Sequence, residues 1–314
     1  MALAVGSLNV DLLSLTAHKI YGPKGVGALY VSRAARPRVR PITFGGGHER
    51  GLRPGTLATH QIVGFGAACE HAARTLDQDA ARIRGLRELL WAGLQQIGRV
   101  HLNGHPERSV PGILNVSFEG AEGESLVTGL TELAISTGSA CTSASADASF
   151  VLRALGRSTE LAQASLRFGL GRGTTERDVE RAVSAVAREV AKLRGLSPAA
   201  AFDSTGWRGG EIVSGEAGAE QLGTWVRVHL HVSGDTVKDA RAQAYGCPHT
   251  LAVIRWLEER LPGRTRADLV PGDPRDWARL HRVPTEKLGR LLVIEDALRN
   301  CLTAWPSHVA SKTS

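Results

Sequence analysis

Apolar residues recur every three to four positions from about residue 59 to residue 97, which predicts one long amphipathic helix. The same spacing returns after Gly123, around Val151 and from Thr175 to Leu193, and predicts three further helices. Between them, short apolar and β-branched runs predict strands at 100–102, 113–118 and 164–172. Helices and strands that alternate in this way indicate an α/β chain.

The two ends of the chain carry other patterns. Residues 1–33 are typical of a strand, a turn and a second strand. Residues 206–223, rich in glycine, glutamate and serine, indicate a linker. Beyond it, residues 225–232 alternate as a strand, and residues 239–249 predict a strand and turn that lead into a helix over 250–261.

The alternation of the strand at 225–232 places Arg227, His229 and His231 on one face. We expect this face to be exposed to solvent. A metal site that combines the two histidines with Cys247 and His249 is the alternative.

Composition changes this picture little. A chain of 314 residues, 42% of them hydrophobic, suits two globular domains. The net charge of +7 comes from arginines spread over helix faces without interleaved aromatic residues, so we expect no nucleic-acid partner, although an acidic protein partner stays open. No apolar run reaches the roughly 20 residues needed to span a membrane, and no basic leading segment is present, so we expect a soluble cytoplasmic protein. The four cysteines form no Cys-x-x-Cys pair, which fits a reducing compartment.

Lys19 is the first candidate for chemistry. It follows Thr16 and His18 and precedes a glycine-rich loop whose backbone can pass close to a ligand. A lysine that loses its proton can form a Schiff base with an aldehyde, and a hydroxyl and an imidazole beside it can hold a phosphate. The alternative is a surface lysine in a flexible loop.

Three further residues stand out. Cys141 lies among small and hydroxylated neighbours at 135–145, which favours an accessible nucleophile over a small core residue. Arg167 lies on a predicted strand, where its planar guanidinium could clamp a carboxylate or, alternatively, face solvent on an edge strand. Thr56, next to Gly55, could approach a phosphate or cap the helix that follows.

These segments together resemble the NifS/IscS-type cysteine desulfurases, pyridoxal-phosphate enzymes of the aminotransferase class V group. The likeness runs through residues 9–14, the lysine segment 16–31, the glycine loop 45–50 and the cysteine segment 135–145. The resemblance implies a homodimer with the cofactor pyridoxal 5′-phosphate. Its site residues would be Lys19 and Cys141 in catalysis, Thr16, His18, Lys19 and Thr56 at the cofactor, and Arg167 at the substrate carboxylate.

In this family, the cysteine thiolate takes sulfur from L-cysteine as a persulfide, and L-alanine is released after protonation by the lysine. The resemblance therefore implies sulfur transfer for iron–sulfur cluster assembly, with a scaffold or another sulfur-acceptor protein as partner. It also implies that Thr56 reaches the cofactor phosphate of the twofold-related subunit.

Residues 207–305 resemble the NifU/IscU-type iron–sulfur scaffold, through the segment Tyr245-Gly246-Cys247. The resemblance implies that Cys247 accepts sulfur. Two of the scaffold's cysteines are replaced: Gln221 and Gly223 stand near the first, and Leu288-Gly289-Arg290 at the third. One cysteine with His249 is an incomplete soft-ligand set, which argues against ordinary iron–sulfur cluster binding.

The expected fold class is α/β: the C-terminal portion of a pyridoxal-phosphate fold-type I transferase, followed by a small α+β scaffold-like domain. The expected boundaries are 1–70 for the end of the large domain, 71–200 for the small domain, 201–223 for a linker, 224–305 for the scaffold-like domain and 306–314 for a tail.

The desulfurase resemblance covers residues 5–200 and only the second half of that family's chain. The first half supplies the aspartate on the pyridine nitrogen and the other ring contacts. We therefore expect a truncated product, or a separate polypeptide that supplies the rest. A non-catalytic sulfur carrier or interaction protein of the same pathway is the alternative function.

Overall fold

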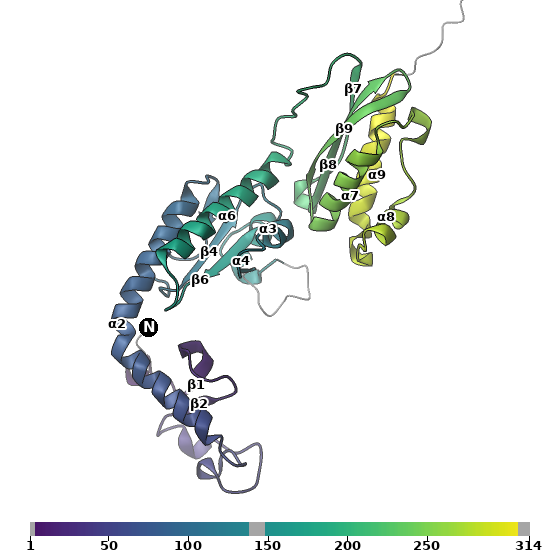
Figure 1. Cartoon of the computed structure of the whole chain (residues 1–314). Helices are drawn as coiled ribbons and strands as arrows, with labels where there is room; N and C mark the ends of the chain where they lie inside the picture. The colour runs from purple at the N-terminus through teal and green to yellow at the C-terminus, as the bar shows by residue number, and fades with distance from the viewer. Residues whose placement is uncertain (1–3, 138–147, 307–314) are drawn as a thin grey trace, which may run out of the picture. The chain divides into compact units, whose positions relative to one another are not determined.

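The computed structural model describes residues 4–137 and 148–306 (Figure 1). The chain divides into two compact units, Met1–Arg84 and Gly85–Ser314. The boundary between the two units falls inside the long helix α2, Thr59–Gln95. The helix predicted from about residue 59 to residue 97 is confirmed by α2.

The first unit is built on an antiparallel hairpin. Helix α1 (Val5–Leu8) precedes strand β1 (Leu12–Thr16), the 3₁₀ turn η1 (Ala17–Ile20) and strand β2 (Gly27–Val31), and the turns η2 (Arg36–Arg38) and η3 (Glu49–Gly51) follow. Thr16 pairs with Gly27, where a Cβ atom would lie 2.4 Å from the Leu15 carbonyl oxygen, so only glycine fits the ladder there. The predicted strand, lysine turn and strand are confirmed.

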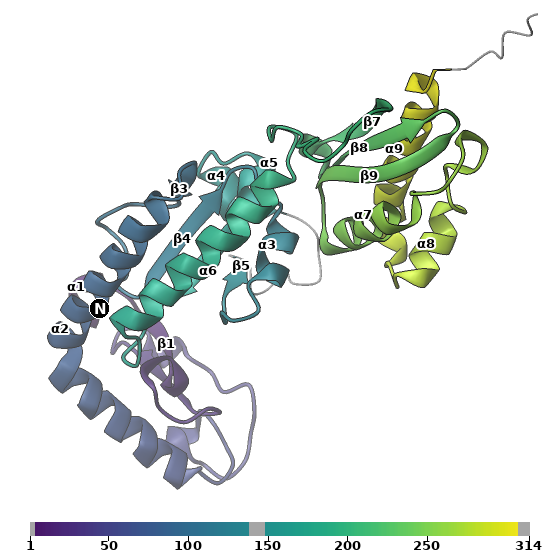
Figure 2. The same cartoon turned by 45° about the horizontal axis from the view of Figure 1, so that its top comes forward.

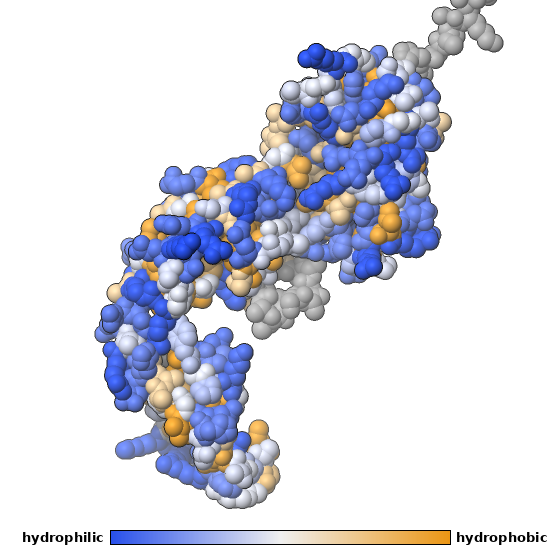
Figure 3. Space-filling model, in the orientation of Figure 1, coloured by the Kyte–Doolittle hydropathy of each residue, from blue (hydrophilic) through white to orange (hydrophobic). Residues whose placement is uncertain are grey.

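This first unit buries little apolar surface. Among its described residues, the buried apolar side chains are Ala17 and Ala35 alone. Larger apolar side chains are exposed, among them Leu12 at 52%, Ile42 at 92% and Phe44 at 83%, and Figure 3 shows such apolar surface scattered among polar residues. A two-stranded hairpin with so small a core is marginally stable alone.

The second unit begins with a four-stranded antiparallel sheet of order β3-β4-β6-β5. Its strands are β3 (Val100–Leu102), β4 (Ile113–Phe118), β5 (Ser136–Thr137) and β6 (Ser165–Gly169), with helices α3 (Gly123–Gly129), α4 (Phe150–Ala154), α5 (Thr159–Gln163) and α6 (Glu176–Gly195). The end of α2 and the amphipathic α6 cover this sheet (Figure 2). Leu90 of α2, Val116 of β4, Leu166 of β6 and Val186 of α6 form the centre of its core.

The same unit ends in a three-stranded antiparallel sheet of order β7-β8-β9. Its elements are β7 (Glu211–Ala219), the turn η4 (Glu220–Leu222), β8 (Thr224–Ser233), β9 (Thr236–Tyr245), α7 (Pro248–Arg260), the turn η5 (Arg266–Asp268), α8 (Pro274–Leu280), the turn η6 (Thr285–Lys287) and α9 (Leu288–Ala304). Helices α7 and α9 cover one face (Figure 1). The alternating Val226, Val228 and Leu230 of β8 are buried in this core with Ile294 and Leu298 of α9.

Part of the predicted linker is wrong. Residues Glu211–Ala219 form β7, which pairs with β8 along its whole length from Glu211 with Val232 to Ala219 with Thr224. Glycine and glutamate content alone indicated a flexible segment, but alternate positions such as Val213 and Gly215 are buried. The strand forms because it packs against α9, a contact that local composition does not reveal.

The residues before β7, 200–210, form a strap across the other face of this sheet. Phe202 stacks on His229 with ring centroids 3.6 Å apart, and Trp207 stacks on His231 at 5.4 Å. The Trp207 indole Nε1–H donates to Asp239 Oδ2 at 2.6 Å, and the Gln243 amide donates to the Ala200 carbonyl at 2.9 Å. The strap therefore shields the face that we expected to be exposed, and His229 is only 5% exposed.

Candidate active site

Lys19 lies on a short turn that the backbone closes tightly. The Ala17 amide donates to the Val26 carbonyl at 3.1 Å, and the Gly22 amide donates to the Ala17 carbonyl at 2.9 Å. Ala17 is fully buried, whereas Lys19 is exposed. The turn thus anchors itself through a small residue and presents the amine outward.

Thr16 and His18 meet beside this lysine. Thr16 Oγ1 and His18 Nδ1 are hydrogen-bonded at 2.8 Å. When the threonine hydroxyl donates, the imidazole proton lies on Nε2 and is free to donate to an anion. The structure therefore brings together the three predicted residues of the lysine segment.

Thr56 is exposed and lies in the irregular segment before α2. The helix begins at Thr59, so Thr56 is too early to cap it, and the predicted alternative of an N-cap is wrong. The nearby Arg53 guanidinium donates to the Gly55 carbonyl at 3.2 Å, which holds the loop around Thr56. A contact of Thr56 with a neighbouring subunit stays a prediction.

Arg167 lies on an inner strand, not on an edge. It pairs with Asn115 of β4 on one side and with Ser136 of β5 on the other, so the predicted alternative of an edge-strand arginine is wrong. Its side chain is half-buried and has no hydrogen bond or ion pair within the described parts of the chain. A half-buried guanidinium in this position is available for a carboxylate.

Cys141 lies outside the described residues. The described chain before it ends in β5, where Ser136 pairs with Arg167 and Thr137 with Leu166. The segment that carries the predicted nucleophile therefore starts from the strand next to the predicted carboxylate clamp.

Sequence reasoning missed a polar cluster beside Arg167. The Asn103 amide donates to Asn115 Oδ1 at 2.7 Å and to Ser117 Oγ at 2.8 Å, and Arg157 donates to Asn103 Oδ1 at 2.7 Å. Arg157 follows the cysteine segment in the sequence, and its hydrogen bonds to Asn103 and Leu102 connect this part of the chain to the sheet. The only signal in the sequence was an asparagine between Leu114 and Val116.

Cys247 is the N-cap residue of α7 and is fully buried. Its Sγ lies 3.6 Å from Thr250 Oγ1, and the neighbouring Gly246 carbonyl accepts a 2.8 Å hydrogen bond from Ser125 Oγ of α3. Of the other two described cysteines, Cys69 is exposed and Cys301 is buried. Burial raises the pKa of the Cys301 thiol to about 12. Cys247 would have to become accessible before it could accept sulfur.

The start of α9, where the resemblance to the scaffold placed a missing cysteine, contacts the sheet domain that precedes it. Arg290 Nη1 lies 3.9 Å from Glu122 Oε1, and Lys287 pairs with Glu124. Burial raises the pKa of the Glu122 carboxyl, and Arg290 opposes that effect. Ion pairs now occupy the region where the resemblance places a metal ligand.

The two histidines of β8 form hydrogen bonds with neighbouring residues of the same domain. His229 Nδ1 is hydrogen-bonded to Ser214 Oγ at 2.7 Å, and its Nε2 lies 3.3 Å from Gln243 Oε1. His231 Nε2 bonds to the Gly209 carbonyl. Within the described residues, no three His, Cys, Asp or Glu side chains lie close enough together to hold a metal ion.

The residues of the lysine turn fit one end of pyridoxal phosphate. The Lys19 amine can react with the aldehyde of the cofactor, and the Thr16 hydroxyl and the His18 imidazole can bind its phosphate. Lys19 is exposed in the described structure, so this turn does not shield the pyridine ring of the cofactor from solvent.

The chain belongs to the aminotransferase class V family, whose family profile matches residues 1–182. It is 55% identical over 194 residues to the cysteine desulfurase IscS of Acinetobacter baumannii (strain AYE), a match that covers 62% of this chain and 48% of the relative. It is 54% identical, with the same coverage, to the cysteine desulfurase IscS of Salmonella schwarzengrund (strain CVM19633). The chain therefore spans about half the length of the curated relatives that it matches.

Among solved structures, a NifS-like protein matches with a TM-score of 0.54 and 33% identity, over 60% of this chain and 49% of that one. Within the part that the structure describes, no helix is long and apolar enough to cross a bilayer.

Proposed function

We propose that this chain provides the lysine, nucleophile and substrate-clamp portion of a pyridoxal-phosphate-dependent cysteine desulfurase. The observation that carries the proposal is the turn at Lys19, where Thr16 and His18 are hydrogen-bonded beside an exposed amine. The membership of the chain in the aminotransferase class V family supports the proposal. The bound cofactor supplies an electron sink for the carbon atoms of the amino-acid substrate.

The chain's own residues take defined roles in this proposal. Thr16 and His18 bind the cofactor phosphate, with Thr56 contributing to the site of a second subunit in a homodimer. Lys19 anchors the cofactor aldehyde and moves a proton at its Nζ atom. Arg167 binds the substrate α-carboxylate, and the Cys141 thiolate takes the sulfur of L-cysteine, so that L-alanine leaves.

The first experiment tests the lysine. The chain is incubated with saturating pyridoxal phosphate, reduced with borohydride, digested and analysed by mass spectrometry. Saturating cofactor is needed because Lys19 is exposed and the first unit has a small core, so retention by this chain alone is expected to be weak. The pyridoxyl mass is expected on Lys19.

Lys24 is the matched control, because it is an exposed lysine of the same loop. Lys19→Ala should abolish the selective modification and Lys24→Ala should leave it unchanged. Equal modification of both lysines would contradict the cofactor site.

The second experiment tests sulfur transfer with labelled L-cysteine. Cys141→Ser should remove the protein-bound label, whereas the exposed Cys69→Ser should retain it. If the chain binds label from an intact desulfurase but releases no alanine itself, the alternative of a non-catalytic sulfur carrier or interaction protein is favoured.

For residues 211–305, we propose a scaffold-like domain of the NifU/IscU type that receives sulfur on Cys247 for iron–sulfur cluster assembly in the cytoplasm. The supporting observation is the Tyr-Gly-Cys turn at the N-terminus of α7. A donor and an acceptor cysteine in one chain would meet at a high effective concentration. Unchanged transfer to downstream acceptors in Cys247→Ser would rule the delivery role out.

A further inference from the structure

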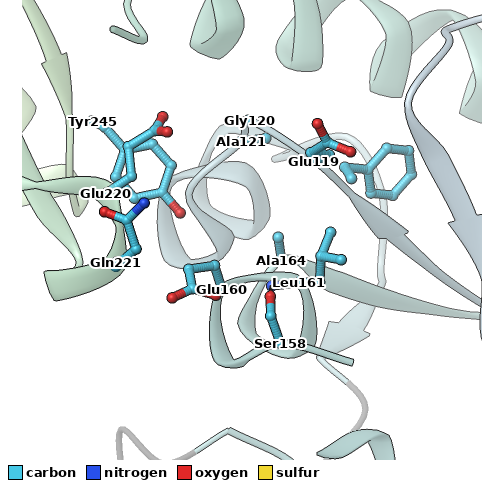
Figure 4. A pocket seen from close by; sticks show the side chains of 11 residues that line it. Glu119, Gly120, Ala121, Ser158, Glu160, Leu161, Ala164, Glu220, Gln221 and Tyr245 are labelled. Atoms are coloured by element: carbon cyan, nitrogen blue, oxygen red, sulfur yellow. Dashed lines mark hydrogen bonds between the residues drawn. The ribbon is translucent and has the colours of Figure 1, made fainter. Parts of the chain in front are cut away.

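A cavity of about 280 Å³ lies where the β4–α3 turn, the start of α5, the turn η4 and the end of β9 meet (Figure 4). Its lining combines the carboxylates of Glu119, Glu160 and Glu220 with the phenol of Tyr245 and apolar side chains such as Phe118 and Leu161. The lysine turn and Arg167 do not line it. The residues that line the cavity are therefore different from the proposed cofactor and substrate residues.

Tyr245 gives this cavity its unusual feature. The residue is 8% exposed, and its hydroxyl has no hydrogen-bond partner among the described residues. Figure 4 shows the hydroxyl directed into the space between Gln221 and Glu160. The hydroxyl faces the cavity, so a ligand that enters can form a hydrogen bond with it in place of water.

The charges around the hydroxyl specify the ligand. Glu119 Oε2 lies 3.1 Å from His101 Nε2, and Glu119 Oε1 lies 4.0 Å from Arg99 Nη1. Glu160 accepts a hydrogen bond from Ser158, which lowers the pKa of its carboxyl and keeps it ionised. Glu220 has no ion pair within the part of the chain that the structure describes; burial raises the pKa of its carboxyl, and the charge of Arg99 opposes that effect. Three carboxylates thus line the cavity, and none of the lining residues is a lysine, arginine or histidine, although Arg99 and Arg153 act on these carboxylates from outside the lining.

The protonation of Tyr245 is also defined. Burial, followed by the charges of Glu122 and Glu220, raises the pKa of its phenol well above the usual range. The phenol therefore stays neutral near pH 7, and its oxygen can accept a hydrogen bond.

We propose that this cavity binds a primary ammonium group at the end of a short alkyl chain. The ammonium has three donors, which match the Glu160 and Glu220 carboxylates and the Tyr245 oxygen. The alkyl chain lies against Phe118, Ala121 and Leu161. The ammonium can belong to a free small amine or to a lysine side chain of another protein.

The test measures binding to the full chain by isothermal titration calorimetry at low salt, with n-butylammonium and Nα-acetyl-lysine amide as probes and n-butanol as the uncharged analogue. We expect saturable binding of at least one cationic probe and none of n-butanol. Glu220→Gln and Tyr245→Phe should each weaken binding about tenfold, the usual scale for losing one hydrogen bond to a charged group. Glu286→Gln is the control, since it removes an exposed carboxylate outside the cavity.

The two probes distinguish the sources of the ammonium. Binding of n-butylammonium alone supports a free amine, and preferential binding of the lysine derivative supports a protein side chain. Binding of neither probe overturns the proposal, as does binding that Glu220→Gln and Tyr245→Phe leave unchanged. No arm measures desulfurase activity, so the result is independent of the proposed function.

Discussion

His229 is held in its neutral form by its surroundings. Burial is the main cause that lowers the pKa of its imidazole, and the charge of Arg227 acts in the same direction, against Gln243 and Glu216. Phe202 covers its ring. A protonated imidazole would lose its hydrogen-bond acceptor at Nδ1, to which Ser214 donates when Nε2 carries the proton.

The folded domain should therefore lose stability on acidification. Because the pKa of His229 is lower in the folded than in the unfolded chain, the unfolded chain binds the proton first as the pH falls through about 6.5. Hydrogen exchange of β8 amides should be slower at pH 7 than at pH 5, after correction for intrinsic rates. His229→Gln should reduce this pH dependence.

His281 acts in the same direction, since burial lowers its pKa as well, so some dependence should remain in His229→Gln. His60→Gln, which removes an exposed imidazole of α2, is the control. A pH dependence as steep in His229→Gln as in the unchanged chain would refute this role of His229.

At the scale of elements, the backbones of β7 and α9 lie so close together at Gly215 that no side chain fits between them. A Cβ atom at Gly215 would lie 2.3 Å from both the Ala297 carbonyl oxygen and the Cys301 amide nitrogen. The glycine thus lets the strand lie directly on the helix backbone.

Gly215→Ala should therefore destabilise the domain by about 2 kcal/mol, because backbone atoms must move apart. Gly289→Ala is the matched control: it lies in α9 with nothing within 4 Å of its added Cβ and should stabilise by about 0.5 kcal/mol. Urea unfolding followed by tryptophan fluorescence measures both. Equal stability of the two variants would contradict the close approach.

The strap is an element without regular secondary structure, and side-chain contacts hold it. Trp207 combines the His231 stack and the Asp239 hydrogen bond with the Arg241 guanidinium, which lies 5.1 Å from its ring centroid. These contacts should be lost together when the indole is removed.

Trp207→Ala should free residues 200–210 for limited proteolysis and lower stability by about 2 kcal/mol. Arg208→Ala, at the exposed neighbouring position, should leave the cleavage rate unchanged. Protection of the strap in Trp207→Ala would mean that other contacts hold it.

At the scale of the whole molecule, the domain of residues 211–305 contacts the sheet domain that precedes it, within the second unit. Ser125 binds the Gly246 carbonyl, Lys287 pairs with Glu124, and Arg290 faces Glu122. The contact includes the turn that carries the buried Cys247, so opening it is one route to exposing that thiol.

Arg290→Gln should loosen this contact by about 1–2 kcal/mol, because the buried Glu122 carboxyl loses its counter-charge. Alkylation of Cys247 by a maleimide under native conditions should then be faster. Arg299→Gln is the matched control, since Arg299 forms an exposed ion pair with Glu295 on the same helix. If both variants react at the rate of the unchanged chain, the contact does not protect Cys247.

The sequence by itself determined the elements whose residues carry a strong local pattern. The spacing of apolar residues predicted α2 and α6, the alternation in 225–232 predicted β8, and the segment around Lys19 predicted a strand, a turn and a strand. Thr16, His18 and Lys19 lie within four residues, so local backbone geometry was enough to bring them together.

Only the tertiary structure decided where the distant contacts form. β7 is stabilised by α9, the strap covers His229, and β4 and β5 place Arg167 on an inner strand. The Tyr245 cavity likewise joins residues more than one hundred positions apart. Such contacts depend on packing between segments far apart in the chain, and a local pattern of residues carries no record of which surface will cover it.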